Sequence, residues 1–223
     1  MHKPSIIFSV LLTVLIPLAI FLLSSNLILR IPQTYEFYFN DSQSIDGIDY
    51  SITVSKMGKS ICSYFSSPGN DDFQVYEING QYKDPVFGDK DKTVMKNAKD
   101  FLFKELVAGL AALLFAVLIY VNTVKKKLRQ YLRIESWIAM GVTAFLFVLQ
   151  LILLSSKGFR AFLYSTFIGV SLTKSSNLLT ILGGSFFKTY LTFDIITGIV
   201  LLLIFAYVNH KYTKPERIFY SRW

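Results

Sequence analysis

Residues 6–29 read IIFSVLLTVLIPLAIFLLSSNLIL, an apolar stretch without a single charged side chain. At about 1.5 Å per residue, a helix of this length exceeds the roughly 30 Å hydrocarbon core of a bilayer. Three further blocks of this kind follow, at about 101–123, 137–154 and 186–208. A chain of 223 residues with 52% hydrophobic and 17% charged residues cannot bury four such blocks in a soluble core. The sequence therefore predicts an all-α membrane bundle of four transmembrane helices, and excludes cytosolic enzymes, secreted domains and fibrous proteins.

The first block is longer than the apolar region of a signal peptide, which has about 7–15 residues, and no small-x-small cleavage pattern follows it. We therefore expect a retained anchor, with a cleaved signal sequence as the alternative. In the second block, the run Ala108-Gly109-Leu110-Ala111-Ala112 favours close approach of another helix, because small residues let two backbones come together.

Charge predicts the orientation of the bundle. Loop 124–136 holds five basic residues against one acid, and tail 209–223 holds four against one. Segment 31–100, in contrast, carries eleven acids and seven lysines. By the positive-inside rule, both termini and loop 124–136 are cytoplasmic, whereas segment 31–100 and the outer loop 155–185 face outside. The basic balance then reflects topology and anionic lipid head groups, and no nucleic-acid partner is predicted.

Three parts of the chain follow from this topology. Residues 1–30 form the cytoplasmic N-terminus and the first transmembrane helix, 31–100 an extracytoplasmic domain, and 101–223 the other three helices with their loops. Clusters of β-formers at 35–39, 48–54 and 75–82 predict strands, and helical spacing predicts a helix over 55–65. We therefore expect a small α+β or β-rich domain between the first and second transmembrane helices.

The residues that usually bind metals or carry nucleophilic catalysis are scarce. Cys62 is the single cysteine, and His2 and His210 lie at opposite ends of the sequence. Segment 84–91 weakly resembles a calcium loop, but it lacks the alternating oxygen ligands, and the interleaved Lys90 favours a solvated loop. No phosphate-binding or serine-nucleophile motif is present. The sequence therefore predicts neither a metal site nor a cofactor.

Asp194 is the most informative single residue, because an ionised carboxylate inside a transmembrane segment is costly and usually faces the bundle interior or water. It is a candidate binding or catalytic acid; the alternative is a structural tie to Lys188 or Lys104, or a shallow position among the lipid head groups. Glu105 opens the second block on the same side of the membrane. Tyr190 is expected as an aromatic residue of the membrane interface, and loop 159–172 as an interfacial or re-entrant segment.

Short motifs along the chain resemble those of a known family. The segments are VSKMGKSICSYFSSP at 54–68, VMKNAKDFLF at 94–103, FRAFL at 159–163 and LLTILGGSFF at 178–187. With the order of one anchor, an outer segment of about 70 residues and three spans, they resemble the lipoprotein intramolecular transacylases (Lit) of Gram-positive bacteria. The resemblance implies transfer of an acyl chain from the diacylglyceryl group of a lipoprotein's terminal cysteine to its amino group. It also implies membrane lipid or a bacterial lipoprotein as the partner, and no cofactor.

The chain departs from this family where the resemblance places its two histidines. Val94 and Leu163 stand there, and Gly184 stands where the family has an acid. Neither apolar side chain can move a proton near neutral pH. We favour a non-catalytic relative that binds lipid or lipoprotein at the outer leaflet over an unrelated four-span accessory or immunity-type protein that binds a partner through its outer domain. An altered enzyme ranks third; its candidate catalytic residues are Asp194, Glu105 and Lys99.

Overall fold

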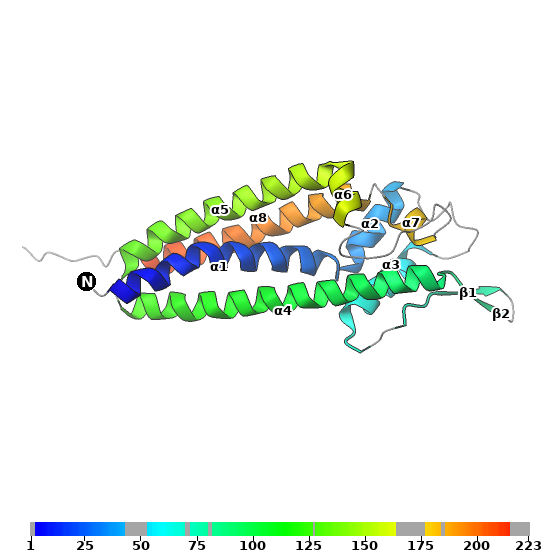
Figure 1. Ribbon diagram of the computed structural model, residues 1–223, viewed down its shortest axis with the longest axis horizontal. Helices are drawn as coiled ribbons and strands as arrows, with labels where there is room; N and C mark the ends of the chain where they lie inside the picture. The colour runs from blue at the N-terminus through cyan, green and yellow to red at the C-terminus, as the bar shows by residue number, and fades with distance from the viewer. Residues whose placement is uncertain are drawn as a thin grey trace, which may run out of the picture.

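The computed structural model describes residues 3–42, 53–69, 72–79, 82–126, 128–163, 177–183 and 186–214. Four long helices run along the long axis of the molecule (Figure 1). Each contains an apolar stretch long enough to cross a membrane. They are α1 (Lys3–Ile28), α4 (Asp89–Lys125), α5 (Arg129–Ser155) and α8 (Phe186–Thr213). The four predicted spans are therefore confirmed as helices of sufficient length.

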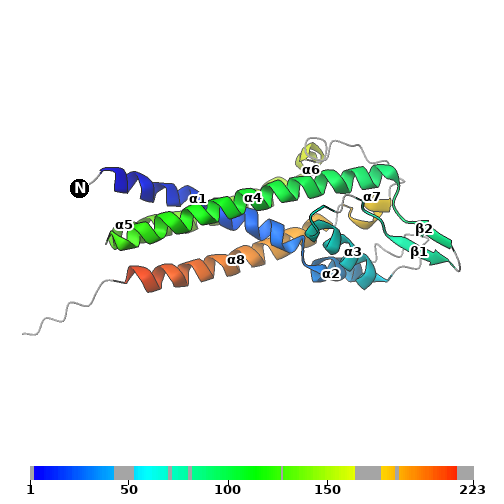
Figure 2. The same ribbon diagram turned by 90° about the horizontal axis from the view of Figure 1, so that it is seen from below.

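Short elements gather at one end of the bundle, which we call the cap end (Figures 1 and 2). The two strands form an antiparallel hairpin in which Tyr76 lies opposite Pro85 and Asn79 opposite Tyr82. The elements are α2 (Pro32–Ser42), α3 (Val54–Ser66), β1 (Tyr76–Asn79), β2 (Tyr82–Pro85), α6 (Lys157–Leu163) and α7 (Asn177–Ile181). We call α2, α3, the hairpin and α7, together with residues 72–75 and 86–88, the cap.

Helix α1 is the central helix of the bundle. It packs against α4, α5 and α8, and half of its apolar stretch is buried, whereas the corresponding stretches of the other three long helices are each about one fifth buried. The outer helices instead expose large apolar side chains such as Leu114, Phe145 and Leu203. An apolar surface of this extent suits contact with lipid chains rather than with water.

Close packing of α1 on α4 depends on the predicted small residues. A Cβ atom added to Gly109 would lie 3.1 Å from side-chain atoms of Leu23, which is closer than ordinary van der Waals contact. One and two turns further along α4, Ala112 and Ala116 are also buried. The expectation that this stripe of α4 allows another helix to approach is confirmed, and the partner helix is α1.

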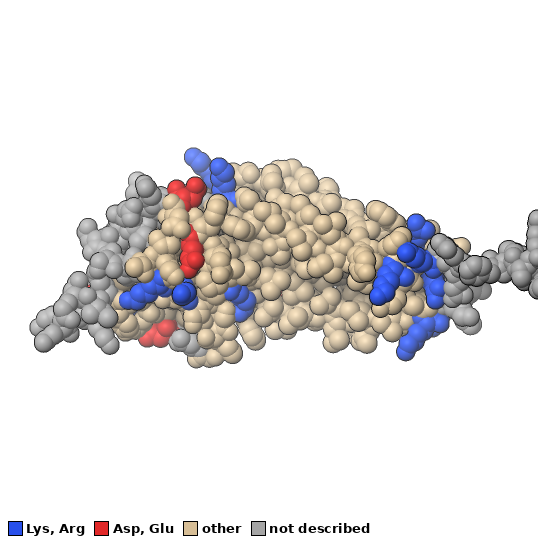
Figure 3. Space-filling model, turned by 180° about the vertical axis from the view of Figure 1, so that it is seen from behind, with Lys and Arg blue, Asp and Glu red and all other residues tan. Residues whose placement is uncertain are grey.

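Charged side chains divide the molecule in the same way as the sequence suggested. On the face shown in Figure 3, carboxylates lie only at the cap end, the opposite end carries only Lys and Arg among its charged residues, and a band without charged side chains separates the two ends. The described start of α1 and the described end of α8 both lie at this basic end (Figure 1).

An aromatic core holds the cap together and joins it to the bundle. Phe186, the first residue of α8, stacks on Tyr35 with ring centroids 5.7 Å apart and meets Tyr38 edge-on at 5.2 Å. Phe73 packs between Tyr64 and Phe87, at centroid distances of 5.0 and 4.8 Å. Such aromatic pairs contribute about 0.5–1.5 kcal/mol each beyond their buried area. The cap is therefore anchored directly on the end of a transmembrane helix.

The prediction of a strand over 35–39 is wrong, because these residues belong to helix α2. The buried aromatic side chains are Tyr35, Tyr38 and Phe39, at helical spacing, while Phe37 is exposed. Alternate burial would have been required for a half-buried strand. Pro32 at the first position of α2 also fits a helix start, where a missing N–H costs nothing.

The other predictions for this segment have mixed outcomes. The helix expected over 55–65 is confirmed as α3, and its predicted apolar face is buried, with Met57 and Ile61 fully enclosed. The strand expected over 75–82 is present as a hairpin, whose turn residues 80 and 81 lie outside the described residues, as do residues 48–52. The described part of segment 31–100 is thus mainly helical, with one short hairpin, and not β-rich.

Candidate functional site

Polar side chains converge inside the apolar bundle near the cap end. They come from all four long helices; half of them are buried and the other half are partly buried. The set, which we call the polar cluster, comprises Ser24, Ser25 and Asn26 at the end of α1, Arg30 just after it, Glu105 on α4, Gln150 on α5, and Tyr190 and Asp194 on α8. Polar groups at membrane depth are costly, so they usually serve a specific interaction.

Glu105 is held by the last turns of α1. The hydroxyl of Ser25 donates a hydrogen bond of 2.7 Å to Oε1, and the amide of Asn26 donates one of 3.4 Å to Oε2. The same amide donates a 2.6 Å hydrogen bond to the backbone carbonyl of Leu102. Glu105 is therefore fixed by neutral donors that join α1 to α4.

Arg30 connects the polar cluster with the cap. Its Nε donates a 2.8 Å hydrogen bond to the Asn26 side-chain oxygen, and its Nη1 donates to the backbone carbonyl of Phe65 at the end of α3. The guanidinium thus reaches Glu105 only through the Asn26 amide. Arg30 positions the cap relative to α1 and does not pair directly with a carboxylate in these contacts.

Asp194 has no exposed surface, and the Gln150 amide donates a hydrogen bond of 2.8 Å to its Oδ2. The alternative of a structural tie to Lys188 or Lys104 is wrong for the described contacts, because both lysines are exposed and Asp194 is bonded to Gln150. Within the described residues, Asp194 Oδ1 and Gln150 Oε1 are enclosed and have no hydrogen-bond partner. Two acceptors therefore remain without a donor at the same place.

Tyr190 is not simply an aromatic residue of the membrane interface. Its side chain interacts with Ser25 and Gln150 and lies beside the carboxylates of Glu105 and Asp194. The charges of Glu105 and Asp194 also act on each other. The structure thus brings together two of the three candidate residues from the sequence, with Tyr190 about one turn before Asp194 on α8.

Lys99, the third candidate, has different surroundings. Its ammonium group lies 4.5 Å from the centroid of the Tyr64 ring in the cap, and the residue is 9% exposed. It precedes Glu105 by six residues, or about 9 Å along α4. A cation over an aromatic face stabilises packing, and here it attaches α4 to α3.

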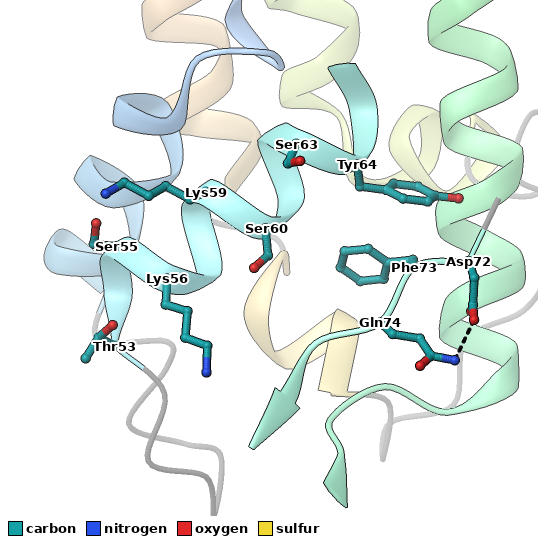
Figure 4. Close-up of a pocket in the computed structure, with 10 residues that line it drawn as sticks. All are labelled: Thr53, Ser55, Lys56, Lys59, Ser60, Ser63, Tyr64, Asp72, Phe73 and Gln74. Atoms are coloured by element: carbon teal, nitrogen blue, oxygen red, sulfur yellow. Dashed lines mark hydrogen bonds between the residues drawn. The ribbon is translucent and has the colours of Figure 1, made fainter. Parts of the chain in front are cut away.

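A groove of about 610 Å³ lies beside α3 on the surface of the cap (Figure 4). The rings of Tyr64 and Phe73 form part of its wall, and the Gln74 amide donates a 2.6 Å hydrogen bond to Asp72 at the edge opposite α3. Hydroxyl groups of Ser55, Ser60 and Ser63 line the α3 side. With Lys56, Lys59 and Asp72, the groove combines aromatic, hydroxyl and charged groups, which suits a polar ligand.

Cys62, on α3, donates its thiol hydrogen to the backbone carbonyl of Arg30. Burial raises the pKa of the Cys62 thiol above its usual range, although Ser66 and Arg30 act in the opposite direction. The protonated thiol therefore adds stability below the unfolded pKa of about 8.5, and this stability is lost as pH rises through the folded value. We expect slow maleimide labelling of the folded protein at neutral pH and rapid labelling after denaturation, as measured by mass spectrometry.

A matched control for this labelling is available on the same helix. Ser63 is exposed next to Cys62, so a Cys62→Ser, Ser63→Cys double variant should be labelled rapidly in the folded state. Equal labelling rates of the two folded proteins would contradict the burial and hydrogen bond of the native thiol.

No group of three or more His, Cys, Asp or Glu side chains in the described part of the chain is placed to hold a metal ion. The histidine that the structure describes, His210, is exposed near the basic end of α8, far along the helix from Asp194. Val94 is 3% exposed in the apolar core of the cap. Loop 159–172 was expected to be an interfacial or re-entrant segment. Arg160 in this loop lies on α6, whereas residues 164–172 lie outside the described residues.

Sequence reasoning missed the partners of the two carboxylates. Gln150 is the one amide in the apolar block 137–154, and Ser24, Ser25 and Asn26 form the one polar run in block 6–29. These interruptions were a readable signal, because polar residues within a span usually face the interior of the bundle. Which of these polar residues contact the two carboxylates could not be predicted, because it depends on the central position of α1 in the bundle.

The chain was compared with known proteins. The family model described as "Lipoprotein intramolecular transacylase Lit" matches residues 10–167. No curated protein sequence matches the chain. A solved in meso structure of the membrane-integral lipoprotein intramolecular transacylase Lit from Bacillus cereus aligns with a TM-score of 0.63 and 17% identity, over 95% of this chain and 98% of that chain.

Two further structures of the same Bacillus cereus protein carry a histidine substituted by arginine or by alanine. Each aligns with a TM-score of 0.66 and 16% identity over 93% of this chain, and covers 92% and 94% of the other chain, respectively. At these identities the likeness establishes the fold. With its four apolar helices, it identifies a multi-pass membrane protein. Because the family model covers residues 10–167, well over half of the 223 residues, the chain belongs to the lipoprotein intramolecular transacylase (Lit) family.

Proposed function

We propose that this protein is a non-catalytic member of its family that binds lipid or lipoprotein at the outer leaflet of the cell membrane. The observation that carries the proposal is Val94. It stands where the resemblance places a family histidine, and it is buried in the apolar core of the cap beside Met95. Acyl transfer to an amine needs a group that can accept a proton near neutral pH, and valine has none.

The placement of the other candidates supports a non-catalytic role over an altered mechanism. A general base must reach the reacting atoms within about 3 Å or through one water. Asp194 has no exposed surface, Glu105 is engaged by two donors from α1, and Lys99 lies over Tyr64. None of these three residues lines the groove beside α3.

We also propose that the cap end faces outside, with both termini in the cytoplasm and residues 31–100 extracytoplasmic. The concentration of basic side chains at the opposite end supports this orientation through the positive-inside rule. The cap would then meet any polypeptide that emerges from a lipid anchor at the outer surface, and the groove beside α3 suits such a segment. Because the chain belongs to the family, the alternative of an unrelated four-span protein is excluded.

The test has two readouts in one host, a bacterium that makes only diacylated lipoproteins. After expression of the full chain, fragmentation mass spectrometry of N-terminal lipopeptides should show both acyl chains still on glycerol. Transfer of one chain to the cysteine nitrogen would overturn the non-catalytic assignment. A Val94→His, Leu163→His double variant is the matched comparison for the wild type in this assay. It places an imidazole at each of the two positions where the resemblance puts a family histidine.

Binding is measured separately on the purified protein. A synthetic diacylated lipopeptide with a photoreactive group should cross-link to the wild type, whereas the unacylated peptide of the same sequence should not. Equal labelling by both peptides, or by neither, would contradict recognition of the lipid-anchored segment.

A further inference from the structure

We propose that the polar cluster binds one monovalent cation between Asp194, Gln150 and Glu105. The observation that carries this inference is the pair of enclosed acceptors, Asp194 Oδ1 and Gln150 Oε1, which have no hydrogen-bond partner among the described residues. Asp194 itself has no exposed surface. Buried acceptors without donors are rare, because each would lose its bonds to water with nothing in return. A cation satisfies both oxygens at once.

The charge balance around the two carboxylates supports a positive ligand. From α1, Arg30 is the charged group on this side, and its Nε is bound to the Asn26 oxygen. From α4 and α8, Lys104 and Lys188 are exposed and directed away from the interior. The described part of α5 contributes Gln150, which is neutral. No described cationic side chain forms an ion pair with Asp194, so within the described part of the chain its charge has no counter-charge.

The ligand chemistry favours a small cation of single charge. Carboxylate, amide and hydroxyl oxygens are ligands for hard cations, and Asp194, Gln150, Ser24 and Glu105 supply these oxygens from four helices. Glu105 already receives two hydrogen bonds from α1, whereas Asp194 receives one from Gln150, interacts with the Ser24 hydroxyl and keeps Oδ1 without a hydrogen-bond partner. The uncompensated charge is therefore centred on Asp194. Either an alkali metal ion or the primary ammonium group of a membrane molecule would supply this chemistry.

The experiment measures thermal unfolding of the purified full chain in choline chloride, replaced stepwise by sodium chloride or by methylammonium chloride at constant ionic strength. Choline is too bulky and has no N–H group for the enclosed site. Above the dissociation constant, we expect the unfolding midpoint to rise with the logarithm of the cation concentration, by about 5 °C once the cation is well in excess of that constant. A response to sodium alone identifies an alkali ion, and a response to methylammonium alone identifies an ammonium group. Identical midpoints in all three salts would overturn the proposal without need of a variant.

Two carboxylate variants place the site. Asp194→Asn keeps the shape of the side chain and removes the charge, so the cation-dependent rise should disappear. Asp100→Asn alters an exposed carboxylate on α4 and should leave the rise unchanged. A rise that persists in Asp194→Asn would overturn the assignment to the polar cluster. An Asp194→Asn midpoint that exceeds the wild-type midpoint by the same amount in every salt would also overturn the assignment. The carboxylate of the wild type would then be neutralised by a proton and not by a bound cation. These outcomes do not depend on lipoprotein binding or on acyl transfer.

Discussion

Replacement of Gly198 by alanine is expected to disrupt the contact between α5 and α8 and to lower the yield of folded protein sharply. A Cβ atom at this position would lie 2.2 Å from Cζ of Phe147, 2.5 Å from Cε2 and 2.9 Å from Cε1. Carbon atoms pack at about 3.5–4.0 Å, so the ring must move by more than an ångström. The Phe147 ring also contacts Phe21 on α1, at a centroid distance of 5.7 Å. Its displacement therefore disturbs the central helix as well.

The expected size of this effect follows from overpacking in a close-packed interior. Inserting a methyl group where no space exists costs about 1–3 kcal/mol or more, which corresponds to a midpoint lowered by roughly 6–12 °C at the upper end of that range. Thermal unfolding of the purified protein in detergent, together with the fraction that elutes as a single species in gel filtration, measures the loss.

Two further variants separate this clash from a general effect of alanine. Gly141 lies on α5 with nothing within 4 Å of its added Cβ atom, so Gly141→Ala should be neutral or slightly stabilising. Phe147→Leu in the Gly198→Ala background removes the ring and should recover part of the lost stability. A Gly198→Ala protein that unfolds at the wild-type midpoint would contradict the packing described between α5 and α8.

The four long helices were predictable because each carries its signal locally, in the length and apolarity of one segment. The partner of a helix is not local information. Gly109 was recognised within a run of small residues, and the structure gives it α1 as a partner. Gly198 stands alone in an apolar block, where nothing in the sequence indicates that an aromatic ring from another helix covers it.

The cap shows how intrinsic preference can mislead. Tyr35, Tyr38 and Phe39 are β-formers, yet their spacing fits one face of a helix, and burial of that face in the aromatic core of the cap decided the outcome. Intrinsic strand preference is weak next to the gain from burying three large rings. The period of the aromatic residues was the better predictor here than their identity.

The candidate site was predictable only in part. A charged residue within an apolar block is easy to recognise in the sequence, but its position along the membrane normal is not. Asp194 and Glu105 were both recognised, and the structure places them in one cluster. Lys99 lies close to Glu105 in sequence but on the cap side, where it meets Tyr64. The neutral donors that hold the carboxylates, such as Ser25, were passed over because a single hydroxyl or amide carries little signal by itself.

Replacement of Asn26 by leucine is expected to have the second large effect. Asn26 is 1% exposed, and its side chain serves three groups: it donates to the Leu102 carbonyl and to Glu105, and it accepts from Arg30. Leucine fills a similar volume but leaves all three buried groups without this partner. Each such loss costs about 1–3 kcal/mol, so the total exceeds that of a single hydrogen bond even after local rearrangement.

Comparison of two substitutions at Asn26 tests which of its bonds matters. Asn26→Asp keeps an oxygen for Arg30, but it loses the donors to Leu102 and Glu105 and brings a second carboxylate against Glu105. Its unfolding midpoint should therefore lie below that of the wild type and should rise, relative to the wild type, as the pH is lowered and the added carboxyl group takes up a proton. Asn40→Leu, at an exposed position on α2, is the control and should have little effect. An Asn26→Asp midpoint with the same pH dependence as the wild type would contradict the contact between residue 26 and Glu105. A wild-type midpoint for Asn26→Leu would mean that this amide does not join α1, α4 and the cap. The polar cluster would then have to be held in place by the Ser25 and Gln150 bonds alone.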